Sequence, residues 1–355
     1  MAEKKPFVSV IIPMRNEARY IQACLETLLG QDYPTERMEI IVADGMSKDG
    51  SREIVERFAK THPNIKLIDN PEGIVPPALN RAIRVAQGEY ILRADAHAEY
   101  GNDYISQCVH YLQKTGADNV GGPLITLPGG ENVMARVVAA LTTHPIVVGG
   151  SKFRTSMKEE YADTAVFGAF PRGLFDRIGF FNEALVRNQD NEFNSRIIHY
   201  GGKIFKTPKV VVRYYNQRTL RGLLRQAYRN GMWNVLTLIA NPWSFKFRYF
   251  APFGFVSWLL GFGILSIFFK WALWPLGFAL ISYALVTLLV AGQTSRTHGL
   301  LVALILPMSM FLYHVAYGFG SFAGIVRFCI FGAEARRNAR EGSRPPEPSE
   351  TLIRA

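Results

Sequence analysis

Three long apolar segments in the last third of the chain constrain its fold more than any other feature of the sequence. They run from Tyr249 to Phe269, from Trp271 to Ala291, and from Gly299 to about Val326. A helix that crosses the hydrocarbon core of a bilayer needs about 20 apolar residues, and each segment is long enough. Only Lys270 separates the first two segments, which predicts a tight helical hairpin. We therefore expect a transmembrane region over residues 249–331, with about three spans.

The charge of the chain indicates how it meets the membrane. The formal net charge is +11, and eleven Lys or Arg residues lie between Arg196 and Arg248, directly before the first apolar segment. No Asp or Glu lies between Phe193 and Ala333. Basic residues beside a span are attracted to anionic headgroups and favour the cytoplasmic side. We therefore expect membrane lipids as partners, no nucleic acid, and a multi-pass protein of the cytoplasmic (inner) membrane with its first domain in the cytosol.

The third apolar segment leaves two topologies open. Three complete crossings would place Arg327 and Arg336 outside, against the positive-inside rule, whereas a segment that dips in and returns would keep them inside. As a helix, Gly299–Val326 would be about 40 Å long. That length exceeds one hydrocarbon core of about 30 Å but is too short to cross twice. We therefore expect three crossings, with the C-terminus outside.

The residues before the basic stretch alternate between strand and helix patterns. Expected strands lie at residues 7–12, 39–43, 65–68 and 89–92, and expected helices at 18–29, 51–60 and 76–86. This alternation predicts an α/β fold with a mostly parallel sheet covered by helices. In such sheets ligands bind beyond the carboxyl ends of the strands. Residues 119–187 are less regular, and we expect loops there.

A helix is expected between the α/β region and the first apolar segment. From Thr219 to Leu238 apolar residues recur at helical spacing, while Arg221, Arg225 and Arg229 occupy another face. Such a helix suits the membrane interface. The expected parts of the chain are a cytosolic α/β domain at 1–218, an interfacial helical region at 219–248, the transmembrane region at 249–331, and a charged, disordered tail at 332–355.

Asp95 and His97 stand two residues apart, directly after an expected strand. In a turn this spacing can aim both side chains at one ion. Carboxylate oxygen and imidazole nitrogen both ligate Mn²⁺, whereas Mg²⁺ prefers oxygen and a diphosphate. A metal there could neutralise a leaving diphosphate. An ordinary polar turn gives the same pattern, so the pair by itself is a weak signal.

Asp190 lies at the start of an expected helix. A carboxylate in a first helical turn often complements the helix dipole. It can equally act as the general base that a transfer to a sugar hydroxyl needs. From the residues alone both interpretations stay open.

Other polar residues at strand ends could hold a nucleotide. Pro13, Arg15, Asn16 and Glu17 follow the first strand, and Asp44 ends the second. A capped helix start and a structural carboxylate are the alternatives at these positions. Gln226 and Arg229 could contact a diphosphate, although lipid headgroups would also attract such an arginine.

In their order along the chain, these clusters resemble the family-2 glycosyltransferases of the GT-A fold. The matching residues are Val8-Ser9-Val10-Ile11-Ile12-Pro13 with Arg15-Asn16-Glu17, Asp44-Gly45 with Asp49-Gly50-Ser51, and Ala78-Leu79-Asn80 before Gly88-Glu89-Tyr90. Asp95-Ala96-His97 resembles the metal-binding DxD motif, with His in place of the second Asp. Gln189-Asp190-Asn191-Glu192 resembles the motif that holds the catalytic base. Gln226-Ala227-Tyr228-Arg229-Asn230 is similar to Q-x-x-R-W but lacks its Trp.

The resemblance implies roles for individual residues. The nucleotide-sugar group would comprise Pro13, Arg15, Asn16, Glu17, Asp44, Asn80, Arg93, Asp95, Gln226 and Arg229. Asp95 and His97 would position Mn²⁺ or Mg²⁺ on the diphosphate, and Asp190 would deprotonate the acceptor.

The layout of the chain resembles the membrane-attached glucosyltransferases of succinoglycan-type exopolysaccharide synthesis. This implies an inverting, metal-dependent hexosyltransferase that moves a sugar from a donor such as UDP-glucose to a lipid-linked saccharide in exopolysaccharide or cell-surface glycan synthesis. A processive polysaccharide synthase is one alternative, and a non-catalytic membrane protein that binds nucleotide sugars is another.

Overall fold

A computed structural model describes residues 5–149 and 156–346, which belong to two compact units. The first, called the sheet unit below, comprises Met1–Ile125, Ser156–Tyr214 and Asn338–Ala355. The second, the helical unit, comprises Thr126–Thr155 and Tyr215–Arg337. This division differs from the expected single boundary after residue 218, because residues 126–149 group with the C-terminal helices.

The sheet unit is built on eight strands in the order β3-β2-β1-β4-β9-β6-β10-β8. Their bounds are β1 Val8–Met14, β2 Met38–Asp44, β3 Ile65–Asp69, β4 Tyr90–Arg93, β6 Asn119–Gly122, β8 Glu160–Tyr161, β9 Val166–Pro171 and β10 Ile204–Lys206. The first four strands pair in parallel, as the alternating pattern predicts. Strand β9 runs antiparallel to both β4 and β6, so the sheet is mixed.

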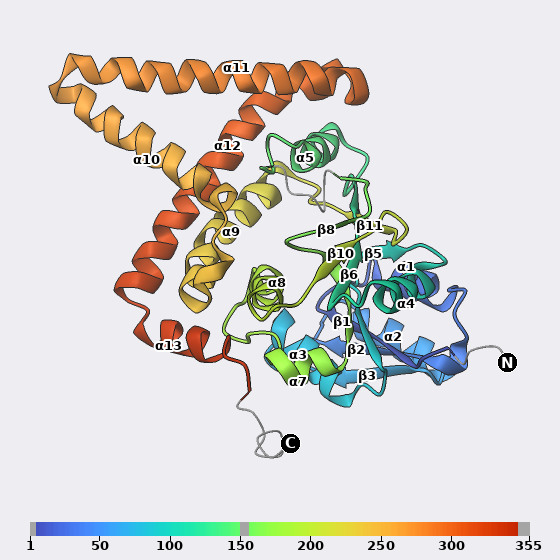
Figure 1. Ribbon diagram of the computed structural model, residues 1–355. Coiled ribbons are helices and arrows are strands. Elements are labelled where there is room, and N and C mark those ends of the chain that lie inside the picture. The colour runs from blue at the N-terminus through green and yellow to red at the C-terminus, as the bar shows by residue number, and fades with distance from the viewer. Residues whose placement is uncertain (1–4, 150–155, 347–355) are drawn as a thin grey trace. The chain divides into compact units, whose positions relative to one another are not determined.

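Helices cover both faces of this sheet. They are α1 Ile21–Leu29, α2 Ser51–Thr61, α3 Val75–Val85, α4 Tyr104–Thr115, α7 Gly173–Ile178 and α8 Gln189–His199 (Figure 1). Side chains of α3, α7 and α8 form one core with Ile11 and Ile41 of the sheet. Val10 and Ile12 point to the opposite face and are also fully buried. Burial on both faces explains why β1 is a continuous apolar run.

The segment from residue 119 to 187, which we expected to consist of loops, contains regular structure. Its described residues, 119–149 and 156–187, hold four strands and two helices, among them β7 Leu124–Leu127 and α5 Val133–Thr143. Strand β7 belongs to a small second sheet with β5 Ala98–Tyr100 and β11 Val212–Tyr215. The strands here are short and rich in glycine, which hides their periodicity. Gly122 is required because a Cβ there would lie 1.7 Å from the carbonyl oxygen of Val210.

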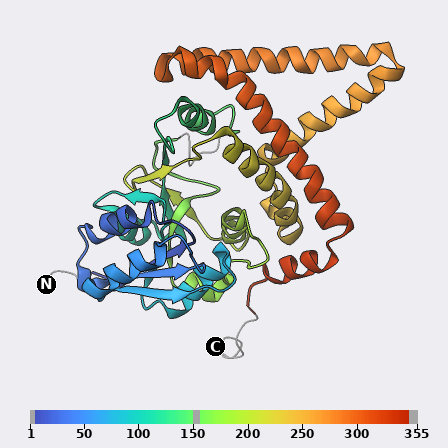
Figure 2. The same ribbon diagram turned by 180° about the vertical axis from the view of Figure 1, so that it is seen from behind.

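The helical unit contains the three apolar segments as α10 Phe247–Phe268, α11 Leu273–His298 and α12 Leu300–Gly324. All three are long and apolar enough to cross a membrane. Figure 2 shows in orange the sharp turn that joins α10 to α11, which confirms the expected hairpin. Large side chains on this hairpin are exposed, including Ile267 at 76% and Trp274 at 82%. Such exposure of apolar side chains is what a lipid environment requires.

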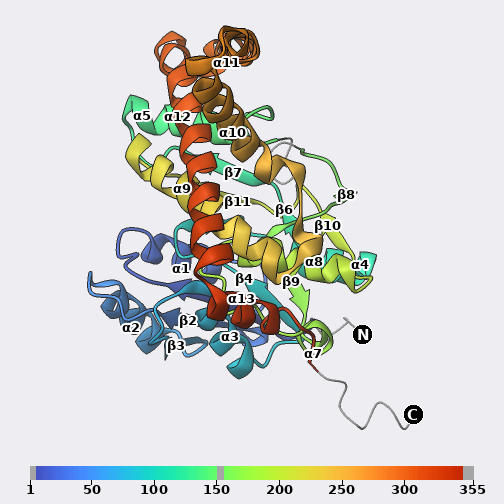
Figure 3. The ribbon, with the colours of Figure 1, turned by 90° about the vertical axis from the view of Figure 1, so that its left-hand side faces the viewer.

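Helix α9, Leu220–Ala240, lies along α12 (Figures 1 and 3). A Cβ at Gly231 would lie 2.1 Å from the carbonyl oxygen of Tyr317, so the two backbones touch. Asn234 is buried and donates to the hydroxyl of Tyr317. The three arginines expected on the opposite face of α9 are exposed. The helix is therefore amphipathic as expected, but α12 covers part of its apolar face. Its place in the membrane interface stays a prediction.

The C-terminal segment corrects one expectation. Residues Ala333–Glu341 form helix α13 instead of a disordered tail, while residues 347–355 lie outside the described residues. Asn182, which is buried, donates to the carbonyl oxygen of Ala339 at 2.6 Å and to Oγ of Ser343 at 2.8 Å. Residues 338–346 thus pack within the sheet unit. The number of crossings and the side of the C-terminus stay predictions.

Candidate active site

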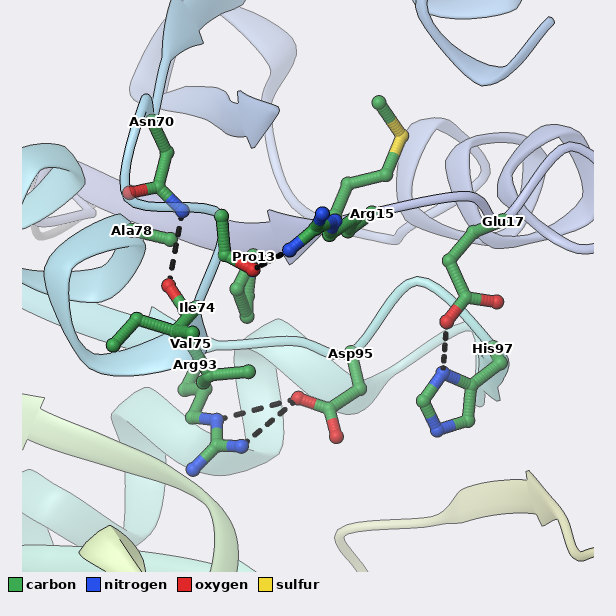
Figure 4. Close-up of a pocket in the computed structure, with 12 residues that line it drawn as sticks. Pro13, Arg15, Glu17, Asn70, Ile74, Val75, Ala78, Arg93, Asp95 and His97 are labelled. Carbon is green, nitrogen blue, oxygen red and sulfur yellow. Dashed lines mark hydrogen bonds and ion pairs between the residues drawn. The ribbon is translucent and has the colours of Figure 1, made fainter. Parts of the chain in front are cut away.

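A pocket of about 150 Å³ opens at the carboxyl ends of β1 and β4 (Figure 4). Its lining comprises Pro13, Met14, Arg15, Glu17, Asn70, Gly73, Ile74, Val75, Ala78, Arg93, Asp95 and His97. Strand β1 is the point where the strand order reverses, with β2 on one side and β4 on the other. Chains leave such a point in opposite directions and open a crevice for a ligand.

Arg93 joins two carboxylates at this crevice. It is the last residue of β4 and is 6% exposed. Its Nη2 and Nε lie 3.1 Å and 3.3 Å from Oδ1 of Asp95, and its Nη1 donates to the carboxylate of Asp190. The backbone N–H of Asp95 donates to the hydroxyl of Tyr100 at 2.7 Å, which fixes the turn after β4. The fold therefore brings the predicted metal ligand and the predicted base to one guanidinium, although they are 95 residues apart.

His97 lies on the other side of Asp95 from Arg93 (Figure 4). Its Nδ1 is 3.0 Å from Oε1 of Glu17, and its ring meets the edge of Tyr214 with centroids 5.1 Å apart. Burial by itself lowers the pKa of His97, but the hydrogen bond to Glu17 and the negative charges of Asp95 and Glu17 outweigh it and raise the pKa above its usual value. Glu17 thus orients the imidazole through Nδ1, and Nε2 is the ring nitrogen that a metal ion would use.

The pair Asp95 and His97 fits a divalent cation only in part. Within residues 5–149 and 156–346, no group of three or more His, Cys, Asp or Glu side chains could hold a metal ion. Two protein ligands suit an ion that takes its remaining ligands from a diphosphate and water. The carboxylate of Glu17 behind His97 matches the way that metal-binding histidines are oriented by a second carboxylate.

The wall of the pocket opposite Arg93 includes a turn that sequence reasoning missed. Nη1 of Arg15 donates to the carbonyl oxygen of Gly73 at 2.7 Å. Gly73 has a φ of +62°, and its N–H donates to the carbonyl oxygen of Asn70 at 3.0 Å. The side chain of Asn70 donates to the carbonyl oxygen of Ile74 at 2.9 Å. Asn70-Pro71-Glu72-Gly73 directly after β3 is a turn sequence, which was the signal available.

Five predicted nucleotide-binding residues do not line the pocket, and three of them belong to the sheet unit. Asn80 is buried, and its amide donates to the carbonyl oxygen of Phe181 at 2.8 Å and to Glu183 at 2.7 Å, while its oxygen accepts from the N–H of Phe181 at 3.0 Å. Asn80 therefore fixes the segment before α8 in this structure, and its contact with the donor stays a prediction.

The other two, Asn16 and Asp44, hold the loop that follows β2. Oδ1 of Asn16 accepts from the N–H of Lys48 at 2.9 Å. Asp44 is fully buried and accepts from the N–H and hydroxyl of Ser47 and from Arg52. Its carboxylate is engaged within the protein in this structure, and its contact with a nucleoside stays a prediction.

The remaining predicted residues lie outside the pocket. Gln226 and Arg229 belong to α9 in the helical unit, with Arg229 exposed, and their contact with a diphosphate stays a prediction. Glu192, in the same motif as Asp190, is buried and makes a two-pronged ion pair with Arg196 at 2.8 Å and 3.0 Å. Of the two acids, Asp190 is the partly exposed one and Glu192 is structural.

Comparison with known proteins gives the family. Residues 9–179 match the family model described as Glycosyl transferase family 2. The succinoglycan biosynthesis protein ExoA of Rhizobium meliloti strain 1021 is 30% identical over 271 residues, which cover 76% of this chain and 81% of that protein. The chain belongs to glycosyl transferase family 2. This confirms the resemblance drawn from the motifs.

Two further relatives of this glycosyl transferase are informative. A dolichyl N-acetyl-alpha-D-glucosaminyl phosphate 3-beta-D-2,3-diacetamido-2,3-dideoxy-beta-D-glucuronosyltransferase of Methanococcus voltae is 27% identical over 329 residues, which cover 90% of this chain and 98% of that protein. The mannosyltransferase PcManGT of Pyrobaculum calidifontis, solved with GDP-Man and Mn²⁺, superposes with a TM-score of 0.57 at 21% identity over 88% of this chain and 87% of that chain. The fold is therefore GT-A-like, as expected.

Proposed function

We propose that this glycosyl transferase moves a sugar from a nucleotide diphosphate donor to a lipid-linked saccharide at the cytoplasmic face of the membrane. The observation that carries the proposal is the cluster in which Arg93 joins Asp95 to Asp190, with Arg93 and Asp95 both lining the pocket. It unites the two functions that the reaction needs, a place for the diphosphate and a base for the acceptor.

The relatives support the class of acceptor. The Methanococcus protein acts, by its name, on a dolichyl-linked sugar phosphate, and the Rhizobium protein belongs to succinoglycan biosynthesis. The three long apolar helices of this chain would keep its sheet unit beside the bilayer in which such acceptors are dissolved. We take UDP-glucose as the first donor to test.

The donor would lie in the pocket beyond β1 and β4. Pro13 and Arg15 would contact the nucleoside and its phosphates, because they line the wall nearest to the turn at Gly73. Asp95 and Nε2 of His97 would hold Mn²⁺ or Mg²⁺, with Glu17 fixing the ring. When bound, such an ion neutralises charge on the leaving diphosphate.

Asp190 would act as the general base. It takes the proton of the acceptor hydroxyl while the hydroxyl oxygen forms a bond to the anomeric carbon. The bond from that carbon to the diphosphate oxygen breaks, and the nucleoside diphosphate leaves with the electron pair. One displacement of this kind inverts the anomeric configuration. Arg93 would hold both carboxylates in place before substrates bind.

Two alternatives are less well supported. A processive polysaccharide synthase needs a channel through the membrane, whereas the described residues provide three helices long enough to cross, and Asn230 replaces the Trp of the Q-x-x-R-W motif. A non-catalytic nucleotide-sugar-binding protein has no need of a base, yet Asp190 is present and ion-paired with Arg93, which lines the pocket.

Purified full-length protein should be incubated with a panel of radiolabelled nucleotide sugars, membrane lipid extract, and either Mn²⁺ or EDTA. We expect one donor to transfer a single labelled sugar to the lipid fraction, and only with the metal. A labelled polymer would favour the processive synthase. Donor binding without hydrolysis or transfer for every sugar would favour the non-catalytic protein.

A further inference from the structure

The helical unit contains a cavity of about 390 Å³ that the proposed chemistry does not use. Residues of α10, α11, α12 and the short segment after α5 line it. Most of the lining is apolar, including Val147, Phe247 and Phe255. The volume is in the range of ligand pockets, roughly 300–1,000 Å³. It suits part of one chain of a lipid better than the two acyl chains of a phospholipid.

Arg248 is the one arginine among the described residues that line this cavity. It is the second residue of α10, directly before the apolar part of that helix. Gly149 lies against it, because a Cβ at Gly149 would lie 2.6 Å from Cβ of Arg248. None of the described lining residues is acidic. A lining that is mostly apolar and includes an arginine suits an anionic amphiphile.

A polar pair also lines the cavity. The hydroxyl of Tyr283 on α11 lies 2.8 Å from Nδ1 of His314 on α12, and both residues line the cavity. Ionisable residues inside apolar helices are costly to bury, so such a residue is a candidate for a functional site. The pair also joins α11 to α12 at the wall of the cavity.

We propose that this cavity binds the first part of an isoprenoid chain and that Arg248 binds the phosphate joined to it. The inference rests on the proposed function, which supplies a lipid-linked acceptor. A guanidinium pairs strongly with phosphate oxygens. Each isoprene unit carries a rigid double bond, so burying such a chain loses less conformational entropy than burying a saturated chain. Phe247, Phe255 and Tyr283 provide flat apolar surfaces for it.

A photoreactive isoprenyl monophosphate tests the binding directly, with the full-length protein in lipid nanodiscs. We expect the probe to label the α10 peptide that contains Arg248. Undecaprenyl phosphate should displace it, whereas phosphatidylglycerol and inorganic phosphate should not. Equal displacement by phosphatidylglycerol would show that the cavity holds ordinary lipid and would overturn the proposal. Labelling confined to other peptides would overturn it as well.

Kinetic variants test the same site in the transfer assay. Arg248→Gln should raise the KM for the lipid-linked acceptor about tenfold or more, the worth of one charge-assisted hydrogen bond. Arg248→Lys should restore most of the affinity, and the donor KM should not change in either variant. Ala251→Phe should raise the acceptor KM by filling the cavity, whereas Ala284→Phe, at an exposed alanine outside the lining, should not.

The two proposals fail in different ways. A wild-type protein that transfers no sugar to any lipid would refute the proposed function, while probe labelling would still decide the cavity. If transfer occurs but Arg248→Gln and Ala251→Phe match Ala284→Phe in acceptor KM, the cavity proposal is wrong and the proposed function stands. Intact donor hydrolysis shows that each variant is folded.

Discussion

Replacing Gly73 with alanine should weaken donor binding without touching the reacting groups. A Cβ at Gly73 would lie 2.5 Å from Nη1 of Arg15 and 3.0 Å from its Cζ. This is the nitrogen that donates to the carbonyl oxygen of Gly73. Because Arg15 is exposed and flexible, it can move aside at little cost to folding. The methyl group would therefore push the guanidinium out of the pocket wall.

The size of the effect follows from what is lost. A hydrogen bond from a guanidinium to a phosphate is worth about 1.5–3 kcal/mol, so the donor KM of Gly73→Ala should rise roughly ten- to hundredfold. The kcat at saturating donor should stay near that of the wild type, because the lost contact is made in the ground state and in the transition state alike. The positive φ of +62° should cost a further 1 kcal/mol or so of folding stability.

Gly116 provides a matched control for that backbone cost. Its φ is +61°, and no atom lies within 4 Å of the position that a Cβ would take. Gly116→Ala should therefore lose about the same stability in urea unfolding while keeping the donor KM of the wild type. In an Arg15→Ala background, Gly73→Ala should add little further change in KM. Equal donor KM for Gly73→Ala and Gly116→Ala, or a fall in kcat, would refute the role given to Arg15.

Three further predictions follow from other contacts. Asp95→Ala should remove the gain in donor affinity that Mn²⁺ gives in calorimetric titrations with UDP; metal-dependent binding that survives would take Asp95 out of the proposed metal site. Burial raises the pKa of Glu39, but hydrogen bonds from Lys66 and other donors outweigh it, so the pKa is lowered. Ionised Glu39 therefore stabilises the fold above the pKa that it has in the unfolded chain, and this stabilisation is lost as the pH falls through its pKa in the folded protein. Glu39→Gln should make the melting temperature depend less on pH on the acid side, and a curve parallel to that of the wild type would contradict this. Asn182→Ala should speed proteolysis after residue 338 with the donor KM unchanged, and a C-terminal reporter should lie on the side of the sheet unit; a reporter on the opposite side would contradict the tail contact.

The part of the fold that could be predicted from the sequence is the part set by local patterns. The first four strands and the helices between them follow from short apolar runs that alternate with turns, and they lie within a few residues of their expected places. Pro13, Arg15 and Glu17, with Asp95 and His97, reach the pocket because they follow directly the strands that end there. The hairpin of α10 and α11 follows from length and hydropathy alone.

What could not be predicted depends on contacts between distant residues. Asn80 donates to the carbonyl oxygen of Phe181, 101 residues away, and the carboxylate of Asp44 bonds its own loop and Arg52, so neither set of contacts follows from the local sequence. The antiparallel place of β9 also results from non-local pairing. The contact of the C-terminal segment with Asn182 could not be predicted either, because the length of the third apolar segment says nothing about what the residues after it bind.

Transfer by Asp190→Asn tests the central proposal most directly. The variant and the wild type should be compared with the donor identified in the panel, a lipid-linked acceptor and Mn²⁺, and donor affinity should be measured in parallel. We expect the transfer rate to fall roughly 10²–10⁴-fold, the usual worth of a general base, while donor affinity stays within a few-fold of the wild type. Near-normal turnover would remove Asp190 from the mechanism and contradict the account of the site.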